Sequence, residues 1–138
     1  MIKIITGYSL QGGSTTAHMN LVNAFNEFGL GACLYGPHNY PEDKCKFELL
    51  QNFKPHKSDT VIVHFLNVPK FNCKKMIYSS HESDLDPLCN KDLSIYSKIH
   101  YVSRRQQQFH NIKKSYIITI FNWLNANTVM QRNLSKIC

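Results

Sequence analysis

The sequence predicts one α/β domain in which a mainly parallel sheet of about six strands lies between two layers of helices. Short apolar runs alternate with helical stripes along the chain, and this alternation is typical of parallel strands joined by crossover helices. The run Thr60–Phe65 is nearly all β-branched or apolar, as in strands buried on both faces. A length of 138 residues fits a single domain. We therefore expect a Rossmann-like three-layer α/β/α domain over residues 1–138.

The N-terminal segment gives the first strand and the first helix. Ile2–Thr6 is a short apolar run, and Thr15–Phe28 carries apolar residues at helical spacing. Ser14 is the predicted N-cap of this helix, and Gly29 is its predicted stop. The order strand, loop, helix opens a typical parallel unit.

The rest of the chain continues the same alternation. Five further strands are predicted at Leu30–Tyr35, Thr60–Phe65, Lys75–Ser79, Lys98–Val102 and Tyr116–Ile120. Three further helices are predicted at Glu42–Phe53, Ser103–His110 and Asn125–Ile137. Because ligands of parallel sheets bind at the carboxyl ends of the strands, we expect the functional residues directly after the predicted strands.

The loop between the first strand and the first helix favours an anionic ligand. A helix N-terminus offers unpaired N–H groups and the positive end of its dipole, and Gly12 and Gly13 allow a ligand to approach the backbone there. The spacing of Gly7, Gly12 and Gly13 fits neither the P-loop nor the dinucleotide fingerprint. A plain turn whose glycines only reverse the chain is an equal alternative. The favoured ligand is a nucleotide, a phosphate or a sugar phosphate.

Charge is distributed unevenly along the chain. The net charge is +7, and residues 93–138, here called the basic third, contain seven Lys or Arg and no Asp or Glu. Such a surface attracts nucleotide sugars, anionic lipid or nucleic acid; alternatively, it faces an acidic surface of another domain. No nucleic-acid recognition motif accompanies the charges, so nucleic acid is not an expected partner.

The cysteines and the apolar runs indicate the cellular compartment in which the protein is expected. The five cysteines are scattered without C-x-x-C spacing, which favours reduced thiols over disulfides or zinc. No apolar run approaches the ~18 residues needed to span a membrane. We expect a cytoplasmic protein, with peripheral attachment to an anionic membrane as an open alternative.

Five segments carry a family resemblance. They are residues 3–29 with the Gly12-Gly13 loop, Asp59–His64, Met76–Glu82, Tyr101–Phe109 and Ile118–Asn122. In this order they resemble the N-terminal half of a GT-B glycosyltransferase, most closely glycosyltransferase family 4. Phe121-Asn122-Trp123 departs from the family's Pro-Asn-Gly, and nothing in the 138 residues matches the family's C-terminal domain with its pair of glutamates.

The resemblance implies an acceptor-binding domain of an enzyme that transfers a sugar from a nucleotide-sugar donor to a hydroxyl of a carbohydrate or lipid-linked acceptor. Without the C-terminal donor-binding domain, the isolated chain is expected to be inactive. The resemblance implies no cofactor besides the donor substrate and no metal, because the D-x-D spacing of Asp84 and Asp86 falls at the wrong position. The main alternative is a non-catalytic Rossmann-like module that binds a nucleotide or an anion.

His81 is the predicted catalytic residue. It follows a predicted strand, and an imidazole can orient an acceptor hydroxyl or take its proton. The resemblance implies that the matching histidine lies close to the reacting sugar. The structural alternative is a loop histidine that binds a backbone carbonyl.

The other predicted site residues form two sets, one for the donor and one for the acceptor. Those expected to bind the donor phosphates are Gly12, Gly13 and Ser14. Those expected to bind the acceptor are His64, Glu82, Ser103 and Arg104. The alternatives are a core position for His64, a solvated loop for Glu82 and an exposed helix face for Arg104.

Overall fold

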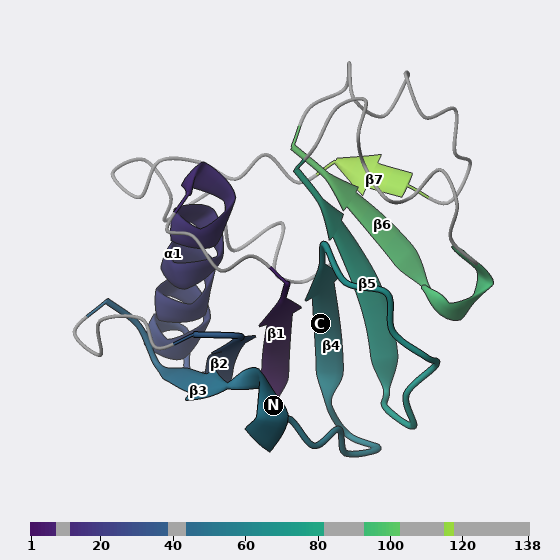
Figure 1. Cartoon of the computed structure of the whole chain (residues 1–138), viewed down its shortest axis with the longest axis horizontal. Coiled ribbons are helices and arrows are strands. Elements are labelled where there is room, and N and C mark those ends of the chain that lie inside the picture. The colour runs from purple at the N-terminus through teal and green to yellow at the C-terminus, as the bar shows by residue number, and fades with distance from the viewer. Residues whose placement is uncertain (8–11, 39–43, 82–92, 103–114, 118–138) are drawn as a thin grey trace.

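The computed structural model describes residues 1–7, 12–38, 44–81, 93–102 and 115–117 (Figure 1). These residues form one sheet of seven strands in the order β3-β2-β1-β4-β5-β6-β7, and every neighbouring pair is parallel. The strands are β1 (Ile2–Thr6), β2 (Ala32–Gly36), β3 (Phe47–Leu49), β4 (Thr60–His64), β5 (Lys75–Ser80), β6 (Lys98–Tyr101) and β7 (Ser115–Ile117). The predicted α/β, Rossmann-like fold class is confirmed.

The strand order reverses beside β1. From β1 the chain first extends the sheet to β2 and β3, and it then crosses back to add β4 to β7 on the other side (Figure 1). In parallel sheets such a reversal leaves a crevice at the carboxyl ends of the two central strands. Here those strands are β1 and β4, and Thr6 is paired in register with His64 at their carboxyl ends.

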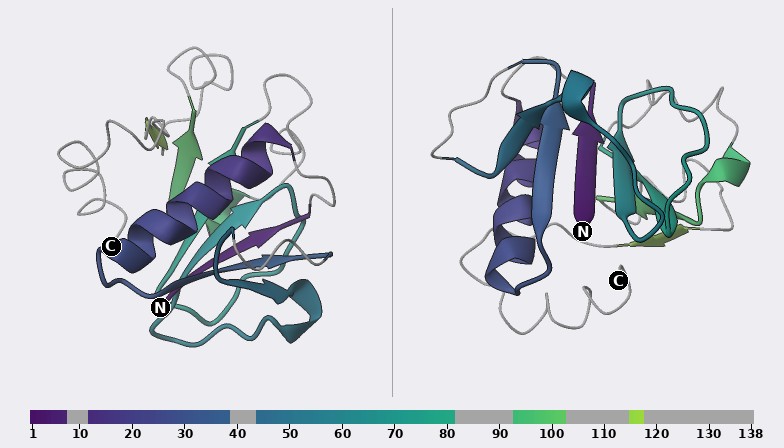
Figure 2. Two further views of the ribbon diagram at one scale, coloured as in Figure 1. Left: turned by 90° about the vertical axis from the view of Figure 1, so that its left-hand side faces the viewer. Right: turned by 90° about the horizontal axis from the view of Figure 1, so that it is seen from below.

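Helix α1 (Gly13–Glu27) lies across one face of the sheet (Figure 2). Its residues Val22 and Phe25 are fully buried against Ile4, Ile62 and Ile77 of the strands. This packing holds the start of the helix above the carboxyl ends of the strands.

The ends of α1 differ in part from the prediction. The N-cap position is taken by Gly12, so the prediction of Ser14 as N-cap is wrong, and Ser14 lies within the first turn. The predicted stop at Gly29 is confirmed, because Gly29 has a φ of 73° and donates its N–H to the carbonyl of Asn26.

The opposite face of the sheet is covered differently in the described part of the chain. The short 3₁₀ helices η1 (Leu50–Asn52) and η3 (Leu93–Ile95) and the loop after β4 cover it (Figure 2). Phe53 contacts the rings of Tyr35 and Phe71 at centroid distances of 5.3 and 5.2 Å.

The helix predicted at Glu42–Phe53 is therefore wrong for its described residues. Phe47–Leu49 pairs with β2 as strand β3. Phe47 packs against the α1 side of the sheet, whereas Leu50 and Phe53 pack against the other side. The helices predicted at Ser103–His110 and Asn125–Ile137 lie outside the described residues.

The amino edge of the sheet is held by an ion pair. Lys3 Nζ lies 2.8 Å from the Asp59 carboxylate, which also accepts the His56 backbone N–H at 2.9 Å. Burial by itself would raise the pKa of Asp59, but Lys3, the His56 N–H and the Met1 amino group lower it, and the net pKa lies below its ordinary value. The pair joins β1 to the start of β4.

Candidate functional site

The α1-facing side of the sheet changes from apolar to polar at its carboxyl edge. Side chains alternate between the two faces of a strand, so residues two apart face the same way. Along β4, Ile62 is followed by His64, and along β5, Ile77 is followed by Ser79. His64 and Ser79 are both almost fully buried. The last row on this face is therefore a buried polar layer.

Four histidines meet in this layer. They are His18 from α1, His64 at the end of β4, His81 directly after β5, and His100 in β6. The His18 ring centroid lies 4.6 Å from that of His64 and 4.7 Å from that of His81. His81 lies 5.2 Å from His64 and 6.1 Å from His100. We call these four residues the histidine cluster.

Two hydroxyl groups bind the cluster. Thr6 Oγ1 lies 3.1 Å from His64 Nδ1, across the β1–β4 register pair. Ser79 Oγ lies 3.0 Å from His18 Nε2 and 3.1 Å from His100 Nδ1. Each hydroxyl thus supports an imidazole that lies in the same row.

Burial keeps His18 and His81 uncharged. Desolvation, and then the neighbouring histidines, lower the pKa of His18 well below its ordinary value, while its bond to the Ser14 carbonyl opposes the shift. The same causes lower the pKa of His81 to about 3. A neutral imidazole can donate one hydrogen bond and accept another, whereas at this pKa it is a weak base near neutral pH. The environment of His81 suits orientation of a hydroxyl better than removal of its proton.

His81 also has an unused polar atom. Its Nε2 is buried and has no hydrogen-bond partner among the described residues. A buried polar atom without a partner costs about 1–3 kcal/mol relative to a paired one. A ligand hydroxyl that reached this atom would recover that cost.

The structure brings some predicted site residues together. His64 and His81 lie in contact within the histidine cluster. His64 is 1% exposed and close to Thr6, as the core alternative expects, but it also contacts two other imidazoles. Glu82, Ser103 and Arg104 lie outside the described residues.

The glycine pair lies at the start of α1, at the same edge of the sheet. Gly12 and Gly13 are exposed, and a Cβ added at either would meet no atom within 4 Å among the described residues. Ser14 is half-buried, and its carbonyl accepts from His18 Nδ1 at 2.7 Å. The first turn of α1 has no side-chain cap and no acidic residue. The positive end of the helix dipole therefore lies at this edge without an acidic side chain in the first turn, an arrangement that favours an anion.

Sequence reasoning missed His18, Ser79 and His100. His18 precedes Val22 and Phe25 by four and seven residues, a spacing that places it on the buried face of the helix. His100 lies between two residues that face the other side of the sheet, so alternation places it on the α1 face. The helical spacing of His18 and the strand alternation of His100 can both be read from the sequence. Both residues lie inside an element, however, whereas site residues were expected directly after the strands.

Gly7 has a structural role that distinguishes it from Gly12 and Gly13, and the sequence alone did not show this difference. A Cβ on Gly7 would lie 2.5 Å from the carbonyl oxygen of Phe65. Gly7 also donates its N–H to the His64 carbonyl at 3.1 Å. Phe65 has a φ of 50°, a left-handed conformation that is costly for a bulky residue. The ends of β1 and β4 are thus closely fitted beside the cluster.

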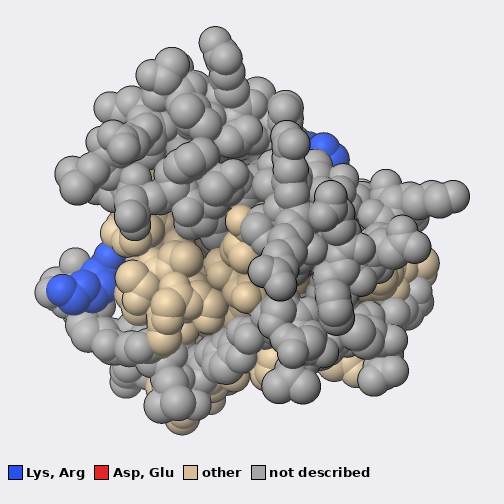
Figure 3. All heavy atoms as spheres, turned by 90° about the horizontal axis from the view of Figure 1, so that it is seen from above, with Lys and Arg blue, Asp and Glu red and all other residues tan. Residues whose placement is uncertain are grey.

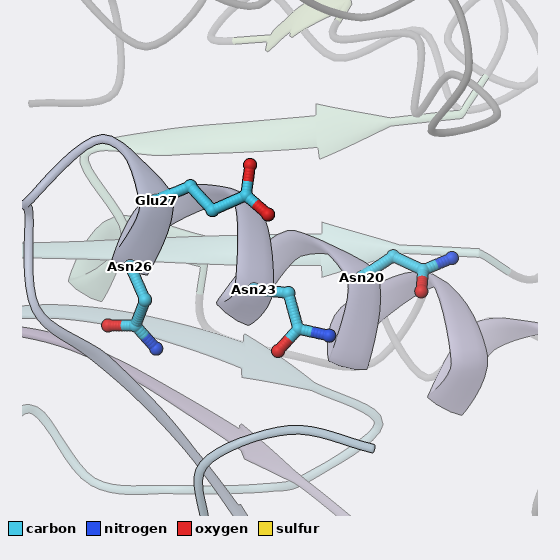
Figure 4. A pocket seen from close by; sticks show the side chains of 4 residues that line it. All are labelled: Asn20, Asn23, Asn26 and Glu27. Atoms are coloured by element: carbon cyan, nitrogen blue, oxygen red, sulfur yellow. The ribbon is translucent and has the colours of Figure 1, made fainter. Parts of the chain in front are cut away.

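Other surfaces are less informative about chemistry. A pocket of about 540 Å³ is lined by Asn20, Asn23, Asn26 and Glu27 of α1 (Figure 4). Asn23 binds the Lys44 carbonyl, and Asn26 binds the backbone of Ala32, so two of these amides already stabilise the fold. Viewed from the carboxyl edge, the visible described surface shows no Asp or Glu and shows Lys or Arg only at its margin (Figure 3).

Within the described ranges, no three His, Cys, Asp or Glu residues are placed to hold a metal ion. None of the helices described is both long and apolar enough to cross a membrane.

Comparison of the chain with family models, curated proteins and solved structures finds no match. The proposed function therefore rests on the geometry of the site and on the sequence resemblance.

Proposed function

We propose that this chain is the acceptor-binding domain of a glycosyltransferase that transfers a sugar from a nucleotide-sugar donor to an acceptor hydroxyl. The observation that carries the proposal is the buried, unpartnered Nε2 of His81 in the described structure, at the carboxyl ends of β4 and β5. It lies next to the strand-order reversal, where parallel sheets bind their ligands.

In this proposal His81 orients the acceptor. Because its imidazole is neutral, His81 can hydrogen-bond an uncharged hydroxyl without an accompanying ion pair. A hydroxyl held in one direction is the kind of positioning that accelerates group transfer. His64 contacts His81 and supports its ring from the neighbouring strand.

The start of α1 is proposed to face the donor phosphates. Its support is the open glycine pair and the uncapped first turn without an acidic residue. The same observation favours the second candidate, a non-catalytic module that binds a nucleotide or another anion. A further domain that carries most of the donor site, a carbohydrate or lipid-linked acceptor, and a cytoplasmic location at or near anionic membranes belong to the proposal as well.

Ligand binding by the isolated chain tests the proposal. Saturation-transfer NMR would compare nucleotide sugars with simple glycosides and lipid-linked sugar acceptors. We expect acceptors to bind, and we expect His81→Ala to weaken that binding about tenfold or more, the loss of one hydrogen bond to the ligand. The matched control is His56→Ala, which removes an exposed histidine near the amino edge.

The outcomes separate the two candidates. Binding of nucleotides without acceptors, unaffected by His81→Ala, would favour the anion-binding module. Acceptor binding that is equally strong in wild type and His81→Ala would overturn the role of His81.

A further inference from the structure

A hydrogen-bonded chain runs through the histidine cluster. It begins at the Ser14 carbonyl, which lies 2.7 Å from His18 Nδ1. It continues from His18 Nε2 to Ser79 Oγ at 3.0 Å and ends at His100 Nδ1, 3.1 Å from the same oxygen. Ser79 and His100 are register partners on β5 and β6, so the sheet itself brings the last two groups together.

The chemistry of the groups fixes the direction of every bond in this chain. A carbonyl oxygen only accepts, so His18 Nδ1 must carry the proton. Because His18 is neutral, its Nε2 must accept, and Ser79 must donate its single hydroxyl hydrogen to it. The Ser79 oxygen can then only accept, so His100 Nδ1 donates. One serine thus determines the bonded nitrogen of two imidazoles.

The His18 ring, whose hydrogen bonds are fixed in this way, lies against the rings of two other histidines. It is fully buried and contacts the rings of His64 and His81 at 4.6 and 4.7 Å. The titratable groups that act on His18 are His64, His81 and His100, and those that act on His81 are His64 and His100. A rotation of the His18 ring would therefore change the surroundings of His81 directly.

We propose that Ser79 is a positioning residue for His81, acting through the fixed chain from His100 to His18. The proposed consequence for the acceptor rests on the proposed function. The hydroxyl of Ser79 holds the plane of the His18 ring, and the His18 ring forms one wall of the space that His81 occupies. Ser79 itself does not touch the ligand in this mechanism.

Long-range ¹H–¹⁵N NMR of the histidine-labelled chain at neutral pH tests the inference without any activity. In the wild type we expect His18 in a single neutral tautomer with the proton on Nδ1, and we expect a proton on Nδ1 of His100. His18 with its proton on Nε2, or a charged His18, would overturn the inference, and this test needs no variant.

A pair of matched variants tests the role of the hydroxyl. Ser79→Ala should shift the Nε2 resonance of His18 toward that of a nitrogen without a hydrogen bond, weaken the Nδ1–H signal of His100 and move the signals of His81. Ser80→Ala removes the next hydroxyl on β5, which is equally buried but faces the other side of the sheet, and it should leave all three histidines unchanged. Unchanged His81 signals in a folded Ser79→Ala chain would overturn the positioning role.

Acceptor binding separates this inference from the proposed function. Ser79→Ala should weaken binding of the acceptor several-fold while nucleotide binding stays unchanged. If the NMR shifts appear but no acceptor binds even the wild type, the hydrogen-bonded chain is right and the proposed function is wrong. If the wild type binds acceptor and Ser79→Ala binds it equally well, the positioning role is wrong and the proposed function survives.

Discussion

Acidification should destabilise this fold well above the pH at which its carboxylates titrate. His18 and His81 are held neutral in the folded chain, because burial lowers the pKa of each. In the unfolded chain both return to a pKa of about 6.5. Below that pH the unfolded state binds more protons than the folded state, so stability falls with falling pH.

The size of the effect follows from the linkage. Each histidine that stays neutral in the fold costs about 1.4 kcal/mol of stability for each pH unit below 6.5. His81, with a pKa of about 3, remains neutral throughout the range from pH 7.5 to 5.5. The pKa of Asp59 lies lower than its ordinary value, so this carboxylate does not titrate in the range either. The two histidines together should cost about 2.7 kcal/mol between these pH values.

Urea unfolding followed by circular dichroism measures this loss at both pH values. The wild type should lose about 2.7 kcal/mol of unfolding free energy, and His81→Gln should lose only about half as much, because one of the two linked groups is gone. His38→Gln removes an exposed histidine outside the cluster and should match the wild type. A wild-type loss below about 0.5 kcal/mol, or an equal loss in His81→Gln, would refute the reasoning.

Three further predictions concern the strand ends, the amino edge and the basic third. Gly7→Ala should lower the unfolding free energy by about 1–3 kcal/mol, because its Cβ would lie 2.5 Å from the Phe65 carbonyl oxygen. Gly13→Ala has open space for its Cβ and should raise the unfolding free energy by about 0.5–1 kcal/mol. Equal effects of the two variants in urea unfolding would contradict this difference. Lys3→Met should lower the unfolding free energy by about 3 kcal/mol at pH 7, because the buried Asp59 loses its closer cation and keeps only the Met1 amino group at 3.5 Å. The stability that Asp59 contributes is present above its unfolded pKa and should disappear as pH falls through its lower folded pKa, so a destabilisation by Lys3→Met that is equally large at low pH would contradict this prediction. The basic third should bind anionic but not neutral vesicles in co-sedimentation at low salt, since each cation near such a surface contributes about 1 kcal/mol; absence of binding would rule this attraction out.

The fold was largely predictable because its strands have strong one-dimensional signals. Ile2–Thr6 agrees with β1 to the residue, since Ile2, Ile4 and Ile5 make most of this short run apolar and are buried in the sheet. The helix predicted to end at Phe53 was wrong because Phe47, Leu50 and Phe53 are spaced by three, as on one face of a helix. In the structure these residues pack on two faces of the sheet: Phe47 lies on one face, and Leu50 and Phe53 lie on the other. Local periodicity cannot distinguish these arrangements, because the pairing with β2 is a tertiary contact.

The candidate site was predictable only in part. The rule that ligands bind after parallel strands led to His64 and His81, which lie side by side at that edge. The rule could not find His18 or His100, because both lie inside elements and join the cluster only through the docking of α1 and the register of β6. The buried Nε2 of His81 is likewise a tertiary property, since it depends on what covers the ring.

Sugar transfer by this chain together with the donor-binding domain that the proposed function requires tests the central claim most directly. With a nucleotide-sugar donor and a hydroxyl acceptor, the account predicts that His81→Ala lowers kcat/KM by about 10²-fold or more, and that His64→Ala lowers it far less. It also predicts no transfer by the 138 residues alone, because catalysis of this kind needs two domains closed around the substrates. Equal rates for the two variants, or turnover by the isolated chain, would contradict the account.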